Sequence, residues 1–161
     1  MDTRFEREQV GIVDFPETPV AVLEHRGDPG LLGDSIRRFI AWRRQAGLHP
    51  STSATFNILY SDPERAPPAA YRIGLCAATA GEVAPNADGV SRAIIPAGRC
   101  AVLRLHGSDD GLGPAAAFLY TGWLPASGEA LRDFPLFCQR VVLPLYRPGQ
   151  EAVTDLFLPL Q

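Results

Sequence analysis

The chain has 161 residues, a length that fits one domain with a substantial core and leaves no room for a second. Apolar residues make up 46% and charged residues 20% of the chain, which excludes an intrinsically disordered protein. The net charge is −3 and all 15 basic residues are Arg, so the composition gives no case for direct binding of nucleic acid.

The first half of the chain has the pattern of a strand, a helix and two further strands. Apolar residues at helical spacing predict the helix, and Gly47 is a candidate for its C-terminal cap. A turn-rich segment at 61–68 separates the last two strands. The expected elements are a lead strand at 10–15, a strand at 20–25, a helix at 31–45, and strands at 55–60 and 71–76.

The second half repeats this order after a small, polar segment at 80–89 that we interpret as a linker. Its helix begins with Pro114, a residue favoured in the first helical turn. The expected elements are strands at 91–95, 100–106, 136–142 and 153–159 and a helix at 114–123.

The two halves also match residue by residue. At a spacing of 80 positions Gly27 matches Gly107, and one residue of slip later Trp42 matches Trp123. Such self-similarity in a conserved order of elements indicates an internal duplication. We therefore expect one α+β domain over 1–161 made of two βαββ units, with repeat one at about 9–79 and repeat two at about 90–161.

The two predicted helices differ in charge. The helix at 114–123 has no charged residue, which is typical of a helix that is buried or lines a cavity. The helix at 31–45 carries Arg37, Arg38, Arg43 and Arg44, which we interpret as a solvated face paired with nearby acids.

Cysteine and histidine give no metal or disulfide pattern. Cys76, Cys100 and Cys138 are odd in number and widely spaced, so buried free thiols are expected. His25 and His106 lie at matching strand ends without a carboxylate or cysteine cluster, and we expect neither a metal nor a cofactor. The N-terminal residues lack a signal peptide's apolar core and no apolar run is long enough to span a bilayer, so a cytoplasmic location is expected.

Several segments, in this order and spacing, resemble the GyrI-like family, the effector-binding domain also found in AraC-type and MerR-type regulators. The resemblance covers nearly the whole chain. The segments are Tyr60-Ser61-Asp62-Pro63, Ile95-Pro96-Ala97-Gly98, Tyr120-x-x-Trp123-Leu124-Pro125, Pro135-Leu136-Phe137 and Thr154-Asp155-Leu156-Phe157-Leu158-Pro159-Leu160. The resemblance implies two βαββ units related by a pseudo-twofold axis, with antiparallel sheets that form a concave, aromatic-lined groove between two helices.

The chain departs from the family at the position that often holds a cation-binding Glu. Cys138 follows Phe137 there, and Arg140 replaces the Tyr commonly found two places further on. Strand alternation places Leu136, Cys138 and Arg140 on one face, and the repeat makes Asn57 equivalent to Cys138. If that face lines the groove, the pocket favours neutral or anionic ligands over cationic ones.

Two alternatives stay open at these positions. Arg140 at a strand end equally fits a guanidinium that extends into water with its stem on apolar neighbours. Cys138 could be a nucleophile, but no residue in the sequence can be identified as a base that would activate it. An inert packing thiol is therefore the better interpretation.

The candidate ligand-binding residues lie in both repeats, and aromatic side chains dominate them because these offer broad contact area to apolar ligands. We expect Phe118 to be core and Tyr60 and Tyr71 to lie at the rim or half-exposed in the sheet. The candidates are Asn57, Tyr60, Tyr71, Phe118, Tyr120, Trp123, Leu136, Cys138 and Arg140.

These features predict a stand-alone small-molecule-binding protein, of effector-binding or multidrug-binding type, that uses the groove between its repeats. No helix-turn-helix segment accompanies the repeats, so direct DNA binding is not expected. Two other functions stay open: a hydrolase of a reactive small molecule in the same pocket, and a DNA gyrase inhibitor acting through protein contact. Loss of the family's Glu weakens the hydrolase interpretation.

Overall fold

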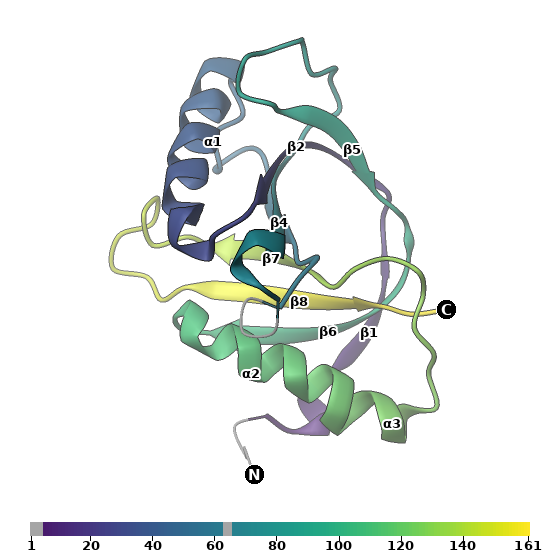
Figure 1. Cartoon of the computed structure of the whole chain (residues 1–161). Helices are drawn as coiled ribbons and strands as arrows, with labels where there is room; N and C mark the ends of the chain where they lie inside the picture. The colour runs from purple at the N-terminus through teal and green to yellow at the C-terminus, as the bar shows by residue number, and fades with distance from the viewer. Residues whose placement is uncertain (1–4, 63–65) are drawn as a thin grey trace. The chain divides into compact units, whose positions relative to one another are not determined.

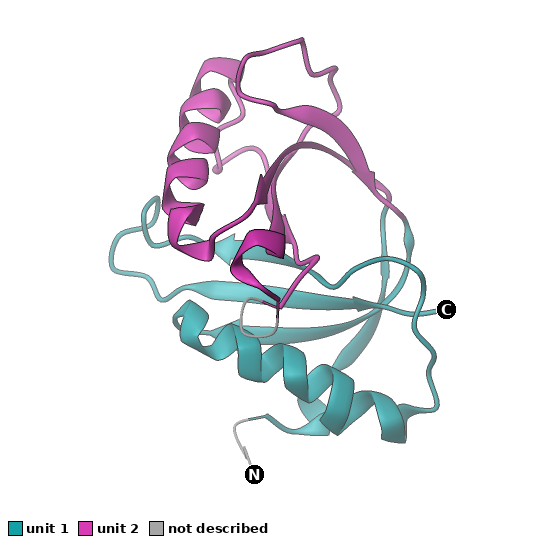
Figure 2. Cartoon of the chain, viewed as in Figure 1, with its two compact units in different colours: residues 1–16, 97–161 teal, residues 17–96 magenta. Residues whose placement is uncertain are grey.

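The computed structural model describes residues 5–62 and 66–161. The chain forms two compact units, one of residues 17–96 and one of residues 1–16 with 97–161 (Figure 2). Each unit contains four antiparallel strands and one long helical segment (Figure 1). The predicted α+β fold built from βαββ units is therefore confirmed. The predicted turn at 61–68 lies partly outside the described residues.

In the unit of residues 17–96 the strands follow the order β3-β4-β2-β5. The strands β2, β3 and β4 and the helix α1 form the βαββ order, and β5 pairs along the outer side of β2. The elements are β2 (Thr18–Arg26), η2 (Pro29–Leu31), α1 (Leu32–Ala46), β3 (Thr55–Ile58), η3 (Pro68–Ala70), β4 (Arg72–Ala78) and β5 (Ser91–Ile95).

In the other unit the strands follow the order β1-β6-β8-β7. The strands β6, β7 and β8 and the helical segment α2-η5-α3 form the βαββ order, and β1 pairs along the outer side of β6. The elements are η1 (Arg7–Gln9), β1 (Gly11–Phe15), β6 (Gly98–His106), η4 (Asp109–Gly111), α2 (Leu112–Ala117), η5 (Phe118–Trp123), α3 (Leu124–Ser127), β7 (Phe137–Val142) and β8 (Val153–Pro159).

The residues matched at a spacing of 80 have the same local structure. Gly27 ends β2 with φ 108° and Gly107 ends β6 with φ 104°. The Gly27 amide donates to Tyr71 O at 2.9 Å, and the Gly107 amide donates to Ala152 O at 2.8 Å. The first strand of each repeat pairs with a strand of the other repeat. The strand β1 of repeat one pairs with β6 of repeat two, and β5 of repeat two pairs with β2 of repeat one.

The one-residue slip in the repeat lies in the second helical segment. The helix α1 has 15 residues and ends at Gly47 with φ 74°, whereas α2, η5 and α3 have 6, 6 and 4 residues and end at Gly128 with φ 75°. The extra residue coincides with η5, a π-helical turn, and a π-bulge is how a helix accommodates one inserted residue. The predicted helix at 114–123 is therefore too short at both ends.

The helical segment of each unit packs on the strands of that unit. In the unit of residues 17–96, Ala21, Leu23, Leu75 and Ala77 form a buried cluster with Phe39 of α1. In the other unit α2 packs on β6, and Leu103, Leu119 and Leu156 are fully buried. The opposite side of that sheet carries three packed rings, with centroids 4.9 Å apart for Phe15 and Phe137 and 5.1 Å apart for Phe137 and Phe157.

The arginines of α1 do not form one solvated face. Arg37 pairs with Asp34, and Arg38 donates to Asp88 O at 2.8 Å, both in exposed positions. The Arg43 side chain is instead buried and donates to three oxygens of the segment that follows the helix. The solvated interpretation was wrong for Arg43, because helical spacing cannot show that a loop folds back onto a residue.

Of the helices that the structure describes, none is long and apolar enough to cross a membrane.

Candidate functional site

The strand β7 presents Cys138 and Arg140 on one side of its sheet. Cys138 lies opposite Leu156 and Arg140 opposite Thr154 in the ladder with β8. Phe137 points to the other side, where its ring stacks on Phe157 at an interplanar angle of 13°. The alternation predicted from the sequence therefore places Cys138 and Arg140 together, and buried Leu136 lies directly before the start of β7.

Arg140 is held by a carboxylate that the sequence analysis missed. Its Nη1 and Nη2 donate to Asp109 Oδ1 and Oδ2 at 2.6 and 3.1 Å, and Nη1 lies 3.4 Å from Thr154 Oγ1. The Arg140 side chain is 15% exposed and that of Asp109 is 63% exposed. The guanidinium is thus mostly covered and not extended into water. The sequence did contain a signal for this pair: Asp109 is an acid in the turn between β6 and the uncharged helix.

The electrostatics around Arg140 keep it charged. Burial alone would lower the pKa of the guanidinium, but the neighbouring Cys138 and Asp109 outweigh this effect and raise the pKa. Cys138 itself is fully buried, as are Cys76 and Cys100, and all three are free thiols. On this side of β7 a buried thiol therefore lies beside a paired, positively charged guanidinium.

The three aromatic residues of the π-helical turn η5 differ in their exposure to solvent. Trp123 is buried, and the half-buried Phe118 ring lies 5.9 Å from the ring of Phe5. Tyr120 is 40% exposed, and burial of the rest of its ring raises the pKa of the phenol. Its hydroxyl therefore stays protonated at neutral pH and is able to donate. Of these three candidates Tyr120 offers the most surface.

The candidates of the first repeat divide between the two sides of their sheet. Asn57 is buried beside Leu75 and its Nδ2 donates to Gly74 O at 3.3 Å. Tyr71 is buried with its ring 6.1 Å from that of His25. Tyr60 lies on the opposite side, where the Arg72 guanidinium covers its ring at 4.3 Å. Strand phase alone could not show this division, because Tyr60 lies beyond the end of β3.

Both ring nitrogens of His25 have hydrogen-bond partners within the fold. One ring nitrogen, Nδ1, lies 2.7 Å from Ser35 Oγ, and the other, Nε2, lies 3.0 Å from Asp28 O. Both nitrogens therefore have partners in the buried contact between β2 and α1. Across residues 5–62 and 66–161, no group of three or more His, Cys, Asp or Glu side chains is placed to hold a metal ion.

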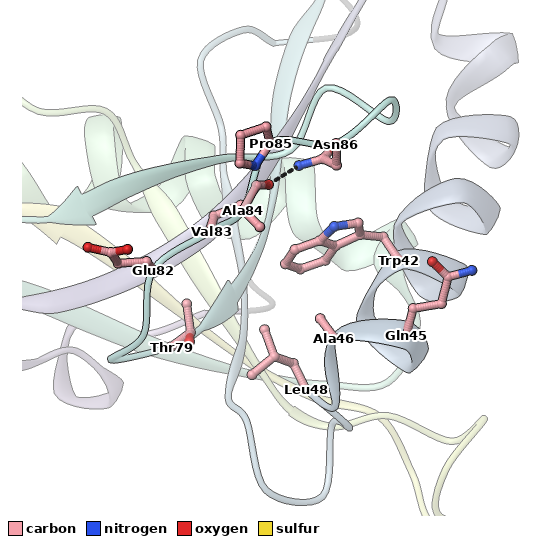
Figure 3. Close-up of a pocket in the computed structure, with 10 residues that line it drawn as sticks. All are labelled: Trp42, Gln45, Ala46, Leu48, Thr79, Glu82, Val83, Ala84, Pro85 and Asn86. Atoms are coloured by element: carbon pink, nitrogen blue, oxygen red, sulfur yellow. Dashed lines mark hydrogen bonds between the residues drawn. The ribbon is translucent and has the colours of Figure 1, made fainter.

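A cleft of about 360 Å³ lies in the unit of residues 17–96, and none of the candidate residues lines it (Figure 3). It opens between the C-terminal end of α1 and the segment after β4, which the sequence analysis interpreted as a linker. The cleft is lined by Trp42, Gln45, Ala46, Leu48, Thr79, Glu82, Val83, Ala84, Pro85 and Asn86.

Comparison with known proteins identifies the family. Residues 8–161 match the model of the GyrI-like small molecule binding domain. The chain is 38% identical over 152 residues to the probable transcriptional regulator YgiV of Escherichia coli K12, a match that covers 94% of this chain and 95% of YgiV.

Two solved structures share the fold. The C-terminal domain of EcmrR aligns with a TM-score of 0.73 at 16% identity, over 95% of this chain and 97% of that domain. SAV2435, solved with tetraphenylphosphonium bound, aligns with a TM-score of 0.58 at 8% identity, over 94% of this chain and 93% of that one. The family match, the YgiV relative and this fold together show that the chain belongs to the GyrI-like small-molecule-binding family.

Proposed function

We propose that the chain binds a small, partly aromatic molecule, neutral or anionic, at Arg140, with Leu136 and Cys138 buried next to it in the same segment. The observation that supports this most is Arg140, a largely buried guanidinium held by the exposed carboxylate of Asp109. Arg140 and Cys138 stand in the segment where the family commonly has a Glu and a Tyr, so a cationic ligand meets a positive charge here. The predicted cytoplasmic location is part of this proposal.

A ligand carboxylate can take the place of Asp109 on Arg140. The Asp109 side chain is 63% exposed, so its carboxylate can return to water when a ligand carboxylate takes its place. The planar guanidinium fork binds a carboxylate through two parallel hydrogen bonds, as it does with Asp109. A neutral ligand leaves the pair intact and uses apolar contacts.

Tyr120 supplies the aromatic contact in this proposal. Its ring is partly exposed on η5, and its neutral hydroxyl can donate to a ligand oxygen. Trp123 is buried and the half-buried Phe118 ring lies against that of Phe5, so both leave Tyr120 as the exposed ring of this turn. Asn57, Tyr60 and Tyr71, together with the groove between the repeats, stay predictions from the sequence.

Three matched ring compounds test the proposal: quinoline-2-carboxylate, quinoline and 1-methylquinolinium. In the Trp42→Phe variant, Trp123 is the remaining fluorophore, because the chain has two Trp residues. We expect saturable quenching of Trp123 with the carboxylate binding at least tenfold more tightly than the cation. Arg140→Gln should remove that preference. Equal or tighter binding of the cation would contradict the proposal.

Turnover distinguishes binding from hydrolysis. The proposal expects no release of p-nitrophenol from p-nitrophenyl acetate above the rate in buffer. Release that Cys138→Ala abolishes, with the fold retained by circular dichroism, would favour the hydrolase alternative.

A further inference from the structure

The cleft at the C-terminal end of α1 has one wall made by the segment of residues 79–86. Figure 3 shows the indole of Trp42 facing this segment across the cleft, with Leu48 and Ala46 at its base. The cleft lies within the unit of residues 17–96 and shares no residue with the surface around Arg140. It is thus independent of the function proposed above.

The wall opposite Trp42 is held in place by many hydrogen bonds. The Asn86 side chain donates to Ala84 O and Val90 O and accepts from the amides of Asp88 and Val90, all within 3.1 Å. Arg38 of α1 donates to Asp88 O at 2.8 Å, which ties the segment to the helix. Hydrogen bonds within the chain thus fix the wall of the cleft, and small-molecule sites are commonly preformed in this way.

Trp42 itself has a fixed orientation. Its indole stacks on the ring of Phe39 with centroids 5.9 Å apart and an interplanar angle of 7°. It packs at the edge of the buried cluster that also receives Leu48 and Val83. One face of the indole is thus supported by the core, and a flat aromatic ligand can pack in the slot between Trp42 and the wall.

The ionisable side chain that lines the cleft is an acid. Of the ten lining residues that the structure describes, Glu82 alone is ionisable. Gln45 and Ala46 belong to the last turn of the 15-residue helix α1, which also carries Arg43 and Arg44, so the negative end of the helix dipole is offset there. The Glu82 carboxylate points away from the indole in Figure 3, so it acts on a ligand through its field and not through contact.

From these features we propose that the cleft is a second small-molecule site, for a planar aromatic molecule that is neutral or positively charged. Its volume of about 360 Å³ lies in the lower part of the usual range for ligand pockets, roughly 300–1,000 Å³, and fits one or two rings. A positive charge on the ligand is attracted by the Trp42 face and by the field of Glu82. A carboxylate is repelled by both.

Fluorescence of the Trp123→Phe variant, in which Trp42 is the remaining Trp, tests this site with the same three compounds. We expect saturable quenching of Trp42 by 1-methylquinolinium and by quinoline, with quinoline-2-carboxylate at least tenfold weaker. N-acetyltryptophanamide gives the collisional baseline. A linear decrease in fluorescence that matches this baseline would overturn the proposal.

A pair of matched variants locates the binding. Ala84→Arg places a bulky positive charge inside the cleft, whereas Ala87→Arg places the same side chain on the same segment outside it. Ala84→Arg should weaken binding of the cation at least tenfold and Ala87→Arg less than twofold. Calorimetric titration of these variants with both Trp residues present avoids reliance on Trp123→Phe. Equal affinities of the two variants would refute the site.

The two sites can fail separately. Arg140→Gln should leave the response of Trp42 unchanged, because Arg140 lies in the other unit. Quenching of Trp123 without Trp42 would leave the proposed function standing and remove the second site. Quenching of Trp42 without quenching of Trp123 would leave the second site standing and contradict the proposed function.

Discussion

Gly122 lies directly against the ring of Phe118 inside the π-helical turn. A Cβ at position 122 would come within 2.7 Å of Phe118 Cδ1 and 2.8 Å of Cε1. On the same turn, Arg7 Nε donates to Gly122 O at 3.3 Å and Thr121 Oγ1 donates to Ala117 O at 2.7 Å. The turn that carries Tyr120 and Trp123 therefore depends on a residue without a side chain.

Gly122→Ala should destabilise the fold by about 1–3 kcal/mol, because the Phe118 ring must leave its position against Phe5. Urea unfolding at pH 7 measures the loss. Gly113→Ala in α2 is the control: a Cβ there meets no described atom within 4 Å, and Ala favours a helix by up to about 1 kcal/mol. Equal stabilities of the two variants would show that the turn tolerates a side chain.

Replacing Arg43 by Met should cost about 2–4 kcal/mol of unfolding free energy. The guanidinium donates to Leu48 O at 2.8 Å, Ser53 O at 2.9 Å and Thr55 Oγ1 at 2.7 Å, and Met leaves these acceptors unpaired. Arg44→Met, one residue further along on the exposed side, should change stability by less than about 0.5 kcal/mol. Thermal unfolding followed by circular dichroism compares them, and similar midpoints would contradict the structural role of Arg43.

The stability contributed by Glu24 should depend on pH. Burial alone would raise the pKa of its carboxyl, but hydrogen bonds and charges from Arg72 and Arg26 outweigh this and lower the pKa below 4.5. The contribution is therefore fully present above the unfolded value of 4.5 and is lost as the pH falls through the lower folded pKa.

Glu24→Gln should thus unfold about 0.5–1 kcal/mol more easily than the natural chain at pH 7, the scale of a partly exposed ion pair. The difference should shrink as the pH falls below 4.5. Urea unfolding of both chains at several values between pH 7 and pH 3 measures it. A constant difference over this range would mean that the mutation acts by packing and not by charge.

Asp109→Asn should increase affinity for quinoline-2-carboxylate about tenfold, because Arg140 then offers its guanidinium without an anionic competitor. Affinity for neutral quinoline should change less than twofold, which separates the charge effect from a change of shape. Calorimetric titration checks both values. A drop in carboxylate affinity would show that Asp109 orients Arg140 for the ligand and does not compete with it.

All three thiols should be unreactive in the folded protein. Cys76, Cys100 and Cys138 are fully buried, and burial raises the pKa of Cys100, with a smaller opposing effect of Arg132. Ellman's reagent should therefore react with less than one thiol per chain in buffer and with three in denaturant. Rapid reaction that Cys138→Ala removes would identify an activated thiol.

Local pattern was sufficient for the order of elements. Apolar spacing predicted α1, and β-branched and aromatic runs predicted the strands, with errors of at most two residues at every end except the C-terminal end of the second helical segment. The matched Gly27 and Gly107 do occupy equivalent turns, so the repeat was visible before the structure. Even the slip between Trp42 and Trp123 was visible, but its cause, an added residue in a π-helical turn, depends on backbone geometry.

What the sequence by itself determined is the duplicated α+β unit, the family and the strand phase that places Cys138 beside Arg140. Periodicity and turn residues act within a few positions along the chain, and these features depend on nothing more distant. Only the tertiary structure decided that Asp109 pairs with Arg140, that Arg43 is buried and that the segment after β4 faces Trp42 across a cleft. Each of these contacts is made between residues from different elements, so burial and pairing follow from how the chain packs and not from local sequence.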